Sequence, residues 1–309
     1  MALLFKSDAD RAELWVPAIR ARLPEMEVRV WPDLGDPDEI EYTLIWKPPA
    51  GLLAGFKNLK AIFSLGAGID HLASDPKLPP QVPVVRMVER GLTSGMTEYV
   101  VMQTLFHHRR MLDYRDQQAC ETWKILPFVP AWKRRVGIMG LGVLGSDAAE
   151  KLATLRLDVA GWSRSPKALD GIDCYHGSEG LEDFLARTEI LVCLVPLTDE
   201  TRGILNAETF AKLPAGACII NAGRGGHLVE EDLLAALESG HIDSASLDVF
   251  HDEPLPAGHP FWQHPRVVVT PHVASITVPE TAIESLAANV ERMEAGLPLE
   301  NVVDFKRGY

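Results

Sequence analysis

The sequence predicts an α/β protein with two domains, each built around a parallel sheet. Short apolar segments alternate with amphipathic stretches along the 309 residues, a pattern typical of strands joined by helices. Continuous apolar runs such as Ile190–Val195 favour strands that are buried on both faces of a sheet. A glycine-rich turn at 140–145 follows one such strand and precedes a helical stretch. The chain is long enough for two ordinary domains.

The first domain is expected to be a smaller, flavodoxin-like α/β domain that spans residues 1–96. Two stretches in it have helical patterns, Asp10–Leu23 and Leu52–Asn58. A later helix, Pro279–Ala295, is expected to return the chain to this domain, so that residues 274–309 complete it. Its predicted strands are Ala2–Lys6, Val28–Trp31, Thr43–Trp46, Ala61–Ser64 and Val84–Arg86.

One long helix is predicted from Thr97 to Trp123, because apolar side chains recur at helical spacing after Thr97. The aromatic stretch Leu126–Trp132 then reads as a packed loop. The second domain, residues 97–273, contains a new series of strands. These are Val136–Met139, Leu157–Trp162, Ile190–Leu194, Ala217–Asn221, Ser244–Val249 and Val267–Thr270.

Composition narrows the possible partners. The formal net charge is −13, which argues against nucleic acid and anionic membranes, since both select basic surfaces. No apolar run approaches the ~20 residues that span a bilayer. The four cysteines form no Cys-x-x-Cys pair, and Cys193 and Cys218 lie in apolar strands. We therefore expect a cytoplasmic protein with no metal site, no membrane contact and no nucleic-acid partner.

The turn Gly140-Leu141-Gly142-Val143-Leu144-Gly145 has the spacing of a dinucleotide-binding loop. Gly140 permits the tight turn, Gly142 lets the backbone approach a diphosphate, and Gly145 allows the helix to pack closely on the strand. The helix that follows offers N–H groups and a positive dipole end to the phosphates. This context predicts a Rossmann-type coenzyme domain.

The end of the next strand bears on the choice of coenzyme. Sites that prefer NAD place an acidic residue there to bind the ribose 2′-hydroxyl, whereas this sequence has Ser163 and Arg164. A guanidinium and hydroxyls would bind a 2′-phosphate through charge-assisted hydrogen bonds. We expect NADP(H) to be preferred, with NAD(H) still possible. The alternative is that Arg164 is a solvated surface arginine.

Polar clusters follow three later strands, where ligands gather in open α/β sheets. Arg224 lies in Asn221-Ala222-Gly223-Arg224-Gly225, Glu253 follows Asp248, and His272 follows Pro271. A guanidinium suits a substrate carboxylate, and an imidazolium beside a carboxylate suits proton donation. The order Arg, Glu, His after a dinucleotide loop is much more specific than any one of these residues.

With these motifs the chain resembles the D-isomer-specific 2-hydroxyacid dehydrogenases over essentially its whole length. Within them it is most similar to the glyoxylate/hydroxypyruvate reductase A group. The segments that carry this resemblance are Ile45-Trp46-Lys47-Pro48-Pro49, Leu65-Gly66-Ala67-Gly68-Ile69-Asp70, Pro196-Leu197-Thr198-Asp199-Glu200-Thr201, Trp262-Gln263-His264-Pro265-Arg266 and Arg307-Gly308-Tyr309.

The resemblance implies reduction of small 2-keto acids such as glyoxylate and hydroxypyruvate. Arg224 would bind the carboxylate and polarise the carbonyl, and His272, oriented by Glu253, would supply the proton. Substrate contacts are implied at Trp46, Ala67 and Gly68, and domain closure is expected to complete the site. The implied cofactor contacts are Gly140, Gly142, Val143, Leu144, Gly145, Ser163, Arg164, Ser165, Pro196, Thr201, Ala222, Gly223 and Asp248.

Two further expectations concern assembly and rival functions. A homodimer is implied by the resemblance, and the Thr97–Trp123 helix with the aromatic loop after it is the candidate interface. The alternatives are another D-2-hydroxyacid dehydrogenase specificity and a non-catalytic dinucleotide-sensing protein.

Overall fold

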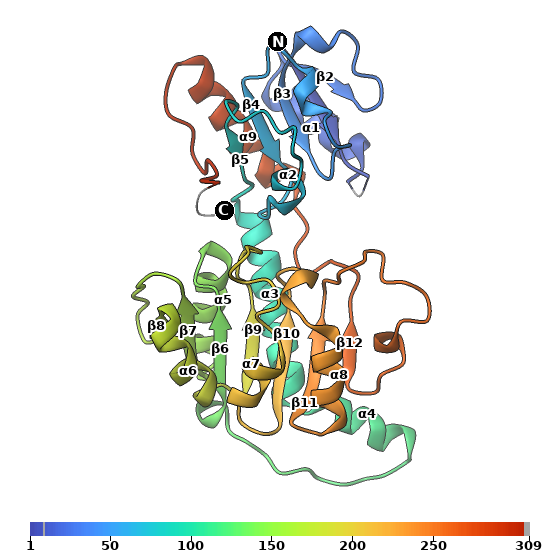
Figure 1. Cartoon of the computed structure of the whole chain (residues 1–309), viewed down its shortest axis with the longest axis vertical. Helices are drawn as coiled ribbons and strands as arrows, with labels where there is room; N and C mark the ends of the chain where they lie inside the picture. The colour runs from blue at the N-terminus through green and yellow to red at the C-terminus, as the bar shows by residue number, and fades with distance from the viewer. Residues whose placement is uncertain (9, 306–309) are drawn as a thin grey trace. The chain divides into compact units, whose positions relative to one another are not determined.

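The computed structural model describes residues 1–8 and 10–305, and it divides the chain into two compact units (Figure 1). Unit 1 consists of Met1–Leu92 and Ile276–Tyr309, and unit 2 consists of Thr93–Ser275. The ending Arg307-Gly308-Tyr309, like the rest of 306–309 in the predicted first domain, lies outside the described residues.

The sheet of unit 1 is parallel, with the strand order β2-β1-β3-β4-β5. This is the flavodoxin-like order, so the predicted fold class of this part is confirmed. Each predicted strand is present: β1 and β4 have the predicted bounds, and the other three strands have shifted ends. The strands are β1 (Ala2–Lys6), β2 (Glu27–Val30), β3 (Ile40–Ile45), β4 (Ala61–Ser64) and β5 (Val84–Val85).

Helices cover this sheet because each presents an apolar stripe to it. On one face α1 (Ala12–Arg22) buries Trp15, and α9 (Pro279–Glu294) buries Leu286 in the same core cluster. The other face is covered by α2 (Asp70–Ala73) and by short turns. The predicted helix Leu52–Asn58 is wrong: only a 3₁₀ turn forms at Leu53–Gly55, because Phe56 turns into extended backbone directly after Gly55.

The sheet of unit 2 is also parallel, with the order β12-β11-β10-β9-β6-β7-β8. Counted within the unit, this is the Rossmann order 3-2-1-4-5-6 with one strand added after the sixth, which confirms the predicted coenzyme-domain fold. The strands are β6 (Arg135–Met139), β7 (Asp158–Ser163), β8 (Asp173–His176), β9 (Ile190–Cys193), β10 (Ala217–Asn221), β11 (Ile242–Leu247) and β12 (Val267–Val269).

The sequence did not predict β8. Its residues Asp173–His176 lie at the edge of the sheet and are exposed or half-buried, so they form no apolar run. Apolar alternation identifies strands through burial, and an edge strand with little buried surface escapes it.

The predicted helix Thr97–Trp123 is two helices, α3 (Arg90–His108) and α4 (Met111–Ala119). Arg110 separates them in the left-handed region, with φ of 56°, and its N–H bonds to the carbonyl of His107. Apolar spacing continues across this break, and for that reason the pattern concealed it. The aromatic side chains of the loop that follows are largely exposed, Trp123 by 99% and Phe128 by 70%, although Ala131 packs against the core of unit 2.

The remaining helices of unit 2 complete two buried layers, one on each face of the sheet. They are α5 (Val143–Thr154), α6 (Gly177–Arg187), α7 (Ala207–Lys212) and α8 (Glu230–Glu238). In addition to Leu53–Gly55, 3₁₀ turns lie at Pro37–Glu39, Ala131–Lys133, Gly225–His227 and Pro260–Trp262.

The strand cysteines behave as small apolar residues. Cys193 and Cys218 are buried free thiols, and burial raises the pKa of each to about 12. Such groups are inert as nucleophiles at neutral pH.

Within 1–8 and 10–305, no helix has the length and apolar character needed to cross a membrane.

Candidate functional site

The glycine loop joins the end of β6 to the start of α5. Gly140 has a φ of +114°, and a Cβ placed on it would lie 2.7 Å from the backbone carbon of Leu194. A Cβ on Gly145 would lie 1.8 Å from the carbonyl oxygen of Gly140. Both positions therefore require glycine, because the turn packs directly against β9 and against the first turn of α5.

Gly142 has a different environment. No atom lies within 4 Å of a Cβ placed there, and no side chain caps the N-terminus of α5, for which Gly142 is the N-cap. The backbone is thus accessible where the N–H groups and the positive end of the helix dipole point outward. These features fit a dinucleotide diphosphate, with Val143 and Leu144 in the first turn.

The end of β7 carries no acidic side chain. Ser163 is the last residue of the strand, and its hydroxyl donates to the carbonyl of Ser165 over 2.8 Å. The Arg164 side chain is 46% exposed, and its Nη1 lies 3.9 Å from Oε2 of Glu200. A carboxylate from the loop after β9 therefore approaches the guanidinium, a contact that the sequence analysis missed. The loop itself is tied together by Thr201, whose hydroxyl donates to the carbonyl of Pro196 over 2.6 Å.

Arg224 stands on the loop after β10, beyond Ala222 and Gly223. The Asn221 side-chain amide donates to the carbonyl of Arg224 over 3.1 Å, and the Arg224 N–H donates to Nδ1 of His227 over 3.0 Å. The half-buried guanidinium donates from Nη1 to the carbonyl of Gly223. Asn221 and His227 thus fix the backbone that presents the guanidinium, and neither was predicted from the sequence to have a role.

The loops after β10 and β11 are in close contact. A Cβ on Gly225, the neighbour of Arg224, would lie 2.0 Å from the backbone carbon of Phe250. The N–H of Phe250 in turn donates to Oε1 of Glu253 over 3.2 Å. Arg224 and Glu253 therefore belong to loops that touch at the carboxyl edge of the sheet.

Glu253 and His272 form a direct pair. Nδ1 of His272 lies 2.9 Å from Oε2 of Glu253, and the two side chains are 31% and 21% exposed. With a carboxylate as its partner, Nδ1 carries the proton, which directs Nε2 away from Glu253. His272 has a φ of 54°, so its backbone is held in the left-handed region.

Asp248 lies beneath this pair and is fully buried. Its Oδ1 accepts hydrogen bonds from the Thr270 hydroxyl and the Val273 N–H, and its Oδ2 accepts one from the Ala274 N–H. The carboxylate therefore binds the loop on both sides of His272. Its predicted contact with the nicotinamide is a separate matter and stays a prediction.

Trp46, Ala67 and Gly68 belong to unit 1 and follow β3 and β4. The Trp46 indole lies against Gly66, where a Cβ would come within 2.8 Å of it, and its ring centroid is 4.2 Å from that of His71. The buried Lys6 ammonium donates to the carbonyl of Lys47 over 2.7 Å. Gly66 and His71 therefore hold the indole ring in place, and Lys6 fixes the backbone turn that carries Trp46.

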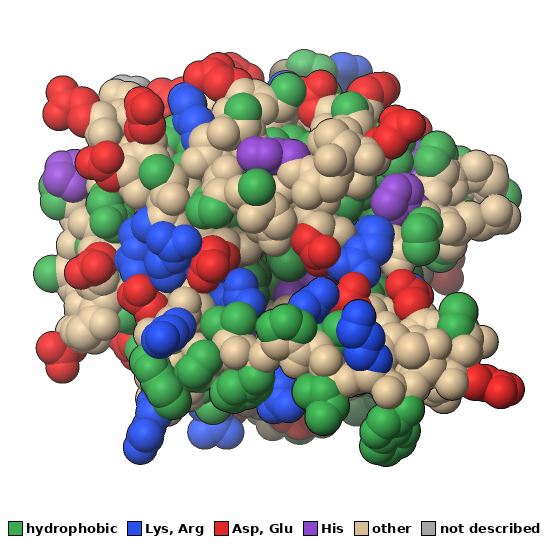
Figure 2. Space-filling view, turned by 90° about the horizontal axis from the view of Figure 1, so that it is seen from below, with side chains coloured by type: hydrophobic (Ala, Val, Ile, Leu, Met, Phe, Trp, Pro, Cys, Tyr) green, Lys and Arg blue, Asp and Glu red, His purple; other side chains and the backbone are tan. Residues whose placement is uncertain are grey.

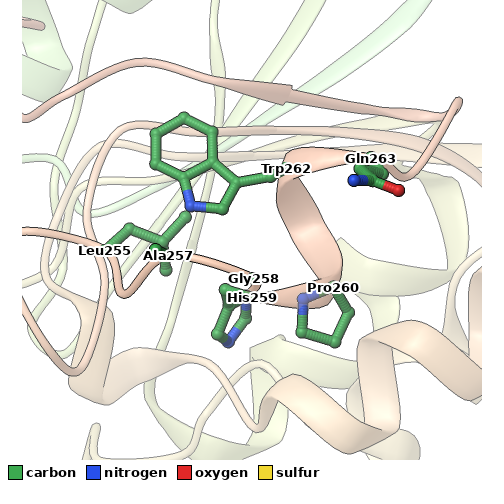
Figure 3. A pocket seen from close by; sticks show the side chains of 7 residues that line it. All are labelled: Leu255, Ala257, Gly258, His259, Pro260, Trp262 and Gln263. Atoms are coloured by element: carbon green, nitrogen blue, oxygen red, sulfur yellow. The ribbon is translucent and has the colours of Figure 1, made fainter.

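A shallow pocket lies elsewhere on unit 2, in the loop that leads from Glu253 towards β12 (Figure 3). The Trp262 indole N–H donates to the carbonyl of Pro256, and Nε2 of His259 lies 3.1 Å from Glu230 of α8. None of the predicted site residues lines it. Its lining is Leu255, Ala257, Gly258, His259, Pro260, Trp262 and Gln263.

The carboxyl edge of the sheet in unit 2 carries three kinds of chemical group. They are a turn that fits a diphosphate, the guanidinium of Arg224, and the carboxylate–imidazole pair of Glu253 and His272. This edge can bind a dinucleotide and an anion, and it can deliver a proton to an oxygen. In the part of the chain that the structure describes, no group of three or more His, Cys, Asp or Glu residues is arranged to hold a metal ion.

Comparison with known proteins identifies the family of this chain. Residues 101–274 match the family described as D-isomer specific 2-hydroxyacid dehydrogenase, NAD binding domain. A glyoxylate/hydroxypyruvate reductase A from Yersinia enterocolitica is 43% identical over the full length of both chains. The chain belongs to the D-isomer specific 2-hydroxyacid dehydrogenase family.

Solved structures of 2-hydroxyacid dehydrogenases superpose closely on this chain. A family member from Xanthobacter autotrophicus, in complex with NADPH and MES, is 46% identical with a TM-score of 0.96, covering 100% of this chain and 99% of the other. An NADPH-dependent glyoxylate/hydroxypyruvate reductase from Sinorhizobium meliloti, in complex with NADP and sulfate, is 42% identical with a TM-score of 0.94 and the same coverage. The predicted family is thereby confirmed.

Proposed function

We propose that this 2-hydroxyacid dehydrogenase reduces small 2-keto acids, glyoxylate and hydroxypyruvate among them, with NADPH as the preferred reductant. The observation that carries the proposal is the Glu253–His272 pair, at 2.9 Å, on the same sheet edge as Arg224 and the glycine loop. Proteins named for this activity that match the full chain support it.

The proposed chemistry divides between the coenzyme and the side chains. NADPH, when bound, supplies the hydride that is added to C2 of the keto acid. Arg224 binds the substrate carboxylate and stabilises negative charge on the carbonyl oxygen. His272 gives the proton from Nε2 to that oxygen, and Glu253 holds the imidazole through Nδ1 and stabilises its charged form. The product is the 2-hydroxy acid, with one hydride and one proton added.

The residues proposed to hold the coenzyme are those that fit it by position. The turn at Gly140, Gly142 and Gly145 and the start of α5 at Val143 and Leu144 take the diphosphate. Ser163, Arg164 and Ser165 take the 2′-phosphate. The loops after β9, β10 and β11 contact the nicotinamide half of the coenzyme. The residues are Pro196, Thr201, Ala222, Gly223 and Asp248. NADH is expected to bind to the same residues with lower affinity, since it lacks the 2′-phosphate.

Arg164→Ala should remove most of the preference for NADPH. A charge-assisted hydrogen bond to the 2′-phosphate is worth roughly 1.5–3 kcal/mol, or about a tenfold to hundredfold change in affinity. Because the Arg164 side chain is 46% exposed, salt screens this contact, and we expect the loss of NADPH affinity to be nearer tenfold. The measurement is kcat/KM for NADPH and NADH in both proteins.

Glu200→Gln is the matched control for this contact. Removing a carboxylate that competes for the guanidinium should raise NADPH affinity about two- to fivefold, the range of an exposed ion pair, and leave NADH unaffected. Equal use of both coenzymes by the wild type would contradict the assignment of Arg164.

Trp46→Ala should extend the substrate range toward larger keto acids. The proposed role of the indole is to limit the space at the substrate side chain by steric exclusion, which acts against bulky substrates without adding affinity for small ones. A series from glyoxylate through hydroxypyruvate to branched 2-keto acids measures this as relative kcat/KM. If the wild type already favours a branched keto acid, Trp46 has no such role.

The same series tests the proposed function. Oxidation of NADPH should be fastest with glyoxylate or hydroxypyruvate. Turnover confined to another keto acid would indicate a different dehydrogenase specificity. Binding of NADPH without turnover of any keto acid would indicate a dinucleotide-sensing protein.

We propose that the enzyme is a homodimer joined through α4 and the loop after it. Trp123, Ile125, Phe128 and Trp132 are all more than half exposed, a larger group of apolar side chains than monomers usually present to water. Figure 2 views the molecule from the end where this loop lies in Figure 1, and hydrophobic side chains gather along one edge of that face. A monomeric mass in light scattering would refute the proposal.

We also place the enzyme in the cytoplasm. All four cysteines are free thiols, among them the exposed Cys120, and a reducing compartment keeps them so.

A further inference from the structure

A chain of hydrogen-bonded hydroxyl groups leads from α3 to the loop that carries His272. The Tyr99 hydroxyl lies 2.9 Å from Oγ1 of Thr270, and Oγ1 of Thr270 lies 2.6 Å from Oδ1 of Asp248. Tyr99 is 6% exposed and Asp248 is fully buried. Thr270, between them, is half-buried, so the chain has a buried residue at each end. Hydrogen bonds away from water strengthen one another.

The direction of these hydrogen bonds follows from the carboxylate. Ionised Asp248 can only accept, so the single proton of the Thr270 hydroxyl points to it. The Thr270 oxygen must then accept from the Tyr99 hydroxyl. Burial raises the pKa of Tyr99 to about 12, so this hydroxyl keeps its proton at neutral pH.

Asp248 transmits this constraint to the backbone of His272. Its carboxylate accepts from the N–H groups of Val273 and Ala274, at 2.9 and 2.8 Å, and its carbonyl accepts from the N–H of His272 at 2.8 Å. His272 is held between these bonds at a φ of 54°. A non-glycine residue in this region costs on the order of 1 kcal/mol or more, so the conformation persists only while its surroundings impose it.

Other polar residues on the same face of α3 as Tyr99 also contact the sheet, and they fix the position of Tyr99. Two turns of α3 beyond it, His107 bonds through Nε2 to the hydroxyl of Ser246 over 2.8 Å, and Ser246 donates to Oε1 of Gln103. Tyr99, Gln103 and His107 are spaced four residues apart and all contact polar groups on or beyond β11. Helix α3 is thereby held in register against the sheet.

We infer that Tyr99 and Thr270 are positioning residues for the proton donor: they orient Asp248, which holds the left-handed backbone from which His272 projects toward Glu253. The inference rests on the proposed role of His272. If the two residues only stabilised the fold, their loss would lower thermal stability and affect coenzyme binding and turnover alike.

Thr270→Val against Thr270→Ser is the decisive pair of variants. Valine keeps the shape of threonine without the hydroxyl, whereas serine keeps the hydroxyl. Displacement of a reacting group by about 1 Å costs on the order of 100-fold, so Thr270→Val should lower kcat with glyoxylate about 10- to 100-fold. The Kd for NADPH, from quenching of tryptophan fluorescence, should change much less than kcat. Although Asp248 is itself proposed to contact the nicotinamide, the proposed diphosphate and 2′-phosphate contacts do not involve Thr270. Thr270→Ser should recover most of kcat.

Tyr99→Phe is the milder second variant, in case Thr270→Val does not fold. It removes only the first donor and should lower kcat severalfold with an unchanged Kd for NADPH. A Thr270→Val or Tyr99→Phe enzyme with wild-type kcat would overturn the inference. So would a kcat loss that Thr270→Ser does not recover, or one matched by an equal loss of NADPH affinity.

A spectroscopic readout separates this inference from the proposed function. In ¹⁵N-labelled protein the Nδ1 resonance of His272, identified by its absence in His272→Ala, reports the hydrogen bond to Glu253. It should shift in Thr270→Val and Tyr99→Phe and return in Thr270→Ser, whether or not a keto acid is turned over. An unchanged resonance would overturn the inference, whereas absence of turnover in the wild type would overturn only the proposed function.

Discussion

His272→Ala is expected to lower kcat for glyoxylate reduction by about 10²–10⁴, the usual contribution of a positioned general acid. The reason is that the proton reaches the carbonyl oxygen in the transition state, where charge on that oxygen develops. Substrate binding depends less on the imidazole, so KM should change much less than kcat. Steady-state kinetics with saturating NADPH measures both.

A matched control for this variant is Glu253→Gln. Glutamine keeps the length of the side chain and an oxygen for Nδ1 of His272, but it does not stabilise an imidazolium. Its kcat should lie between those of the wild type and His272→Ala. A His272→Ala enzyme that retained wild-type kcat would rule out His272 as the proton donor.

Arg224→Ala is expected to lower kcat/KM for the keto acid by about 10²–10⁴. Two charge-assisted hydrogen bonds to the substrate carboxylate, at roughly 1.5–3 kcal/mol each, correspond to a loss of about 3–6 kcal/mol. The loss should appear in KM as well as in kcat, because the carboxylate is bound in the ground state and the carbonyl is polarised in the transition state.

Arg224→Lys provides the control for charge. Lysine keeps one positive charge but not the planar pair of donors, so it should recover only part of the loss. Full recovery would mean that a point charge suffices, and an unchanged KM in Arg224→Ala would remove Arg224 from carboxylate binding. The Kd for NADPH should be similar in all three proteins.

The fold could be predicted because most of its strands are buried on both faces. Strands such as β9 and β10 form continuous apolar runs, and the glycine loop marks the first βα turn of unit 2. The errors occur where that signal is weak. β8 is a polar edge strand, and the break at Arg110 depends on one left-handed residue that apolar spacing does not register.

The candidate site was predicted through motifs, and the structure adds the contacts between them. It brings Glu253 and His272 to 2.9 Å and joins the loops of Arg224 and Glu253 through Gly225. The supporting residues were missed because they act across the fold: Glu200 reaches Arg164 from another loop, and Tyr99 reaches Thr270 from α3. The contact of Tyr99 could have been suspected from the sequence, because Tyr99, Gln103 and His107 are polar residues spaced four apart on an otherwise apolar helix face.

Isotope transfer shows whether the chain adds the hydride of NADPH to C2 of the keto acid as proposed. The purified chain is incubated with hydroxypyruvate and with NADPH deuterated at the transferred position of the nicotinamide, and the product is analysed by chiral chromatography and mass spectrometry. We expect the wild type to form D-glycerate with one deuterium at C2, and His272→Ala to form much less of it. Glycerate of the L configuration, product without deuterium, or equal rates in the two proteins would contradict it.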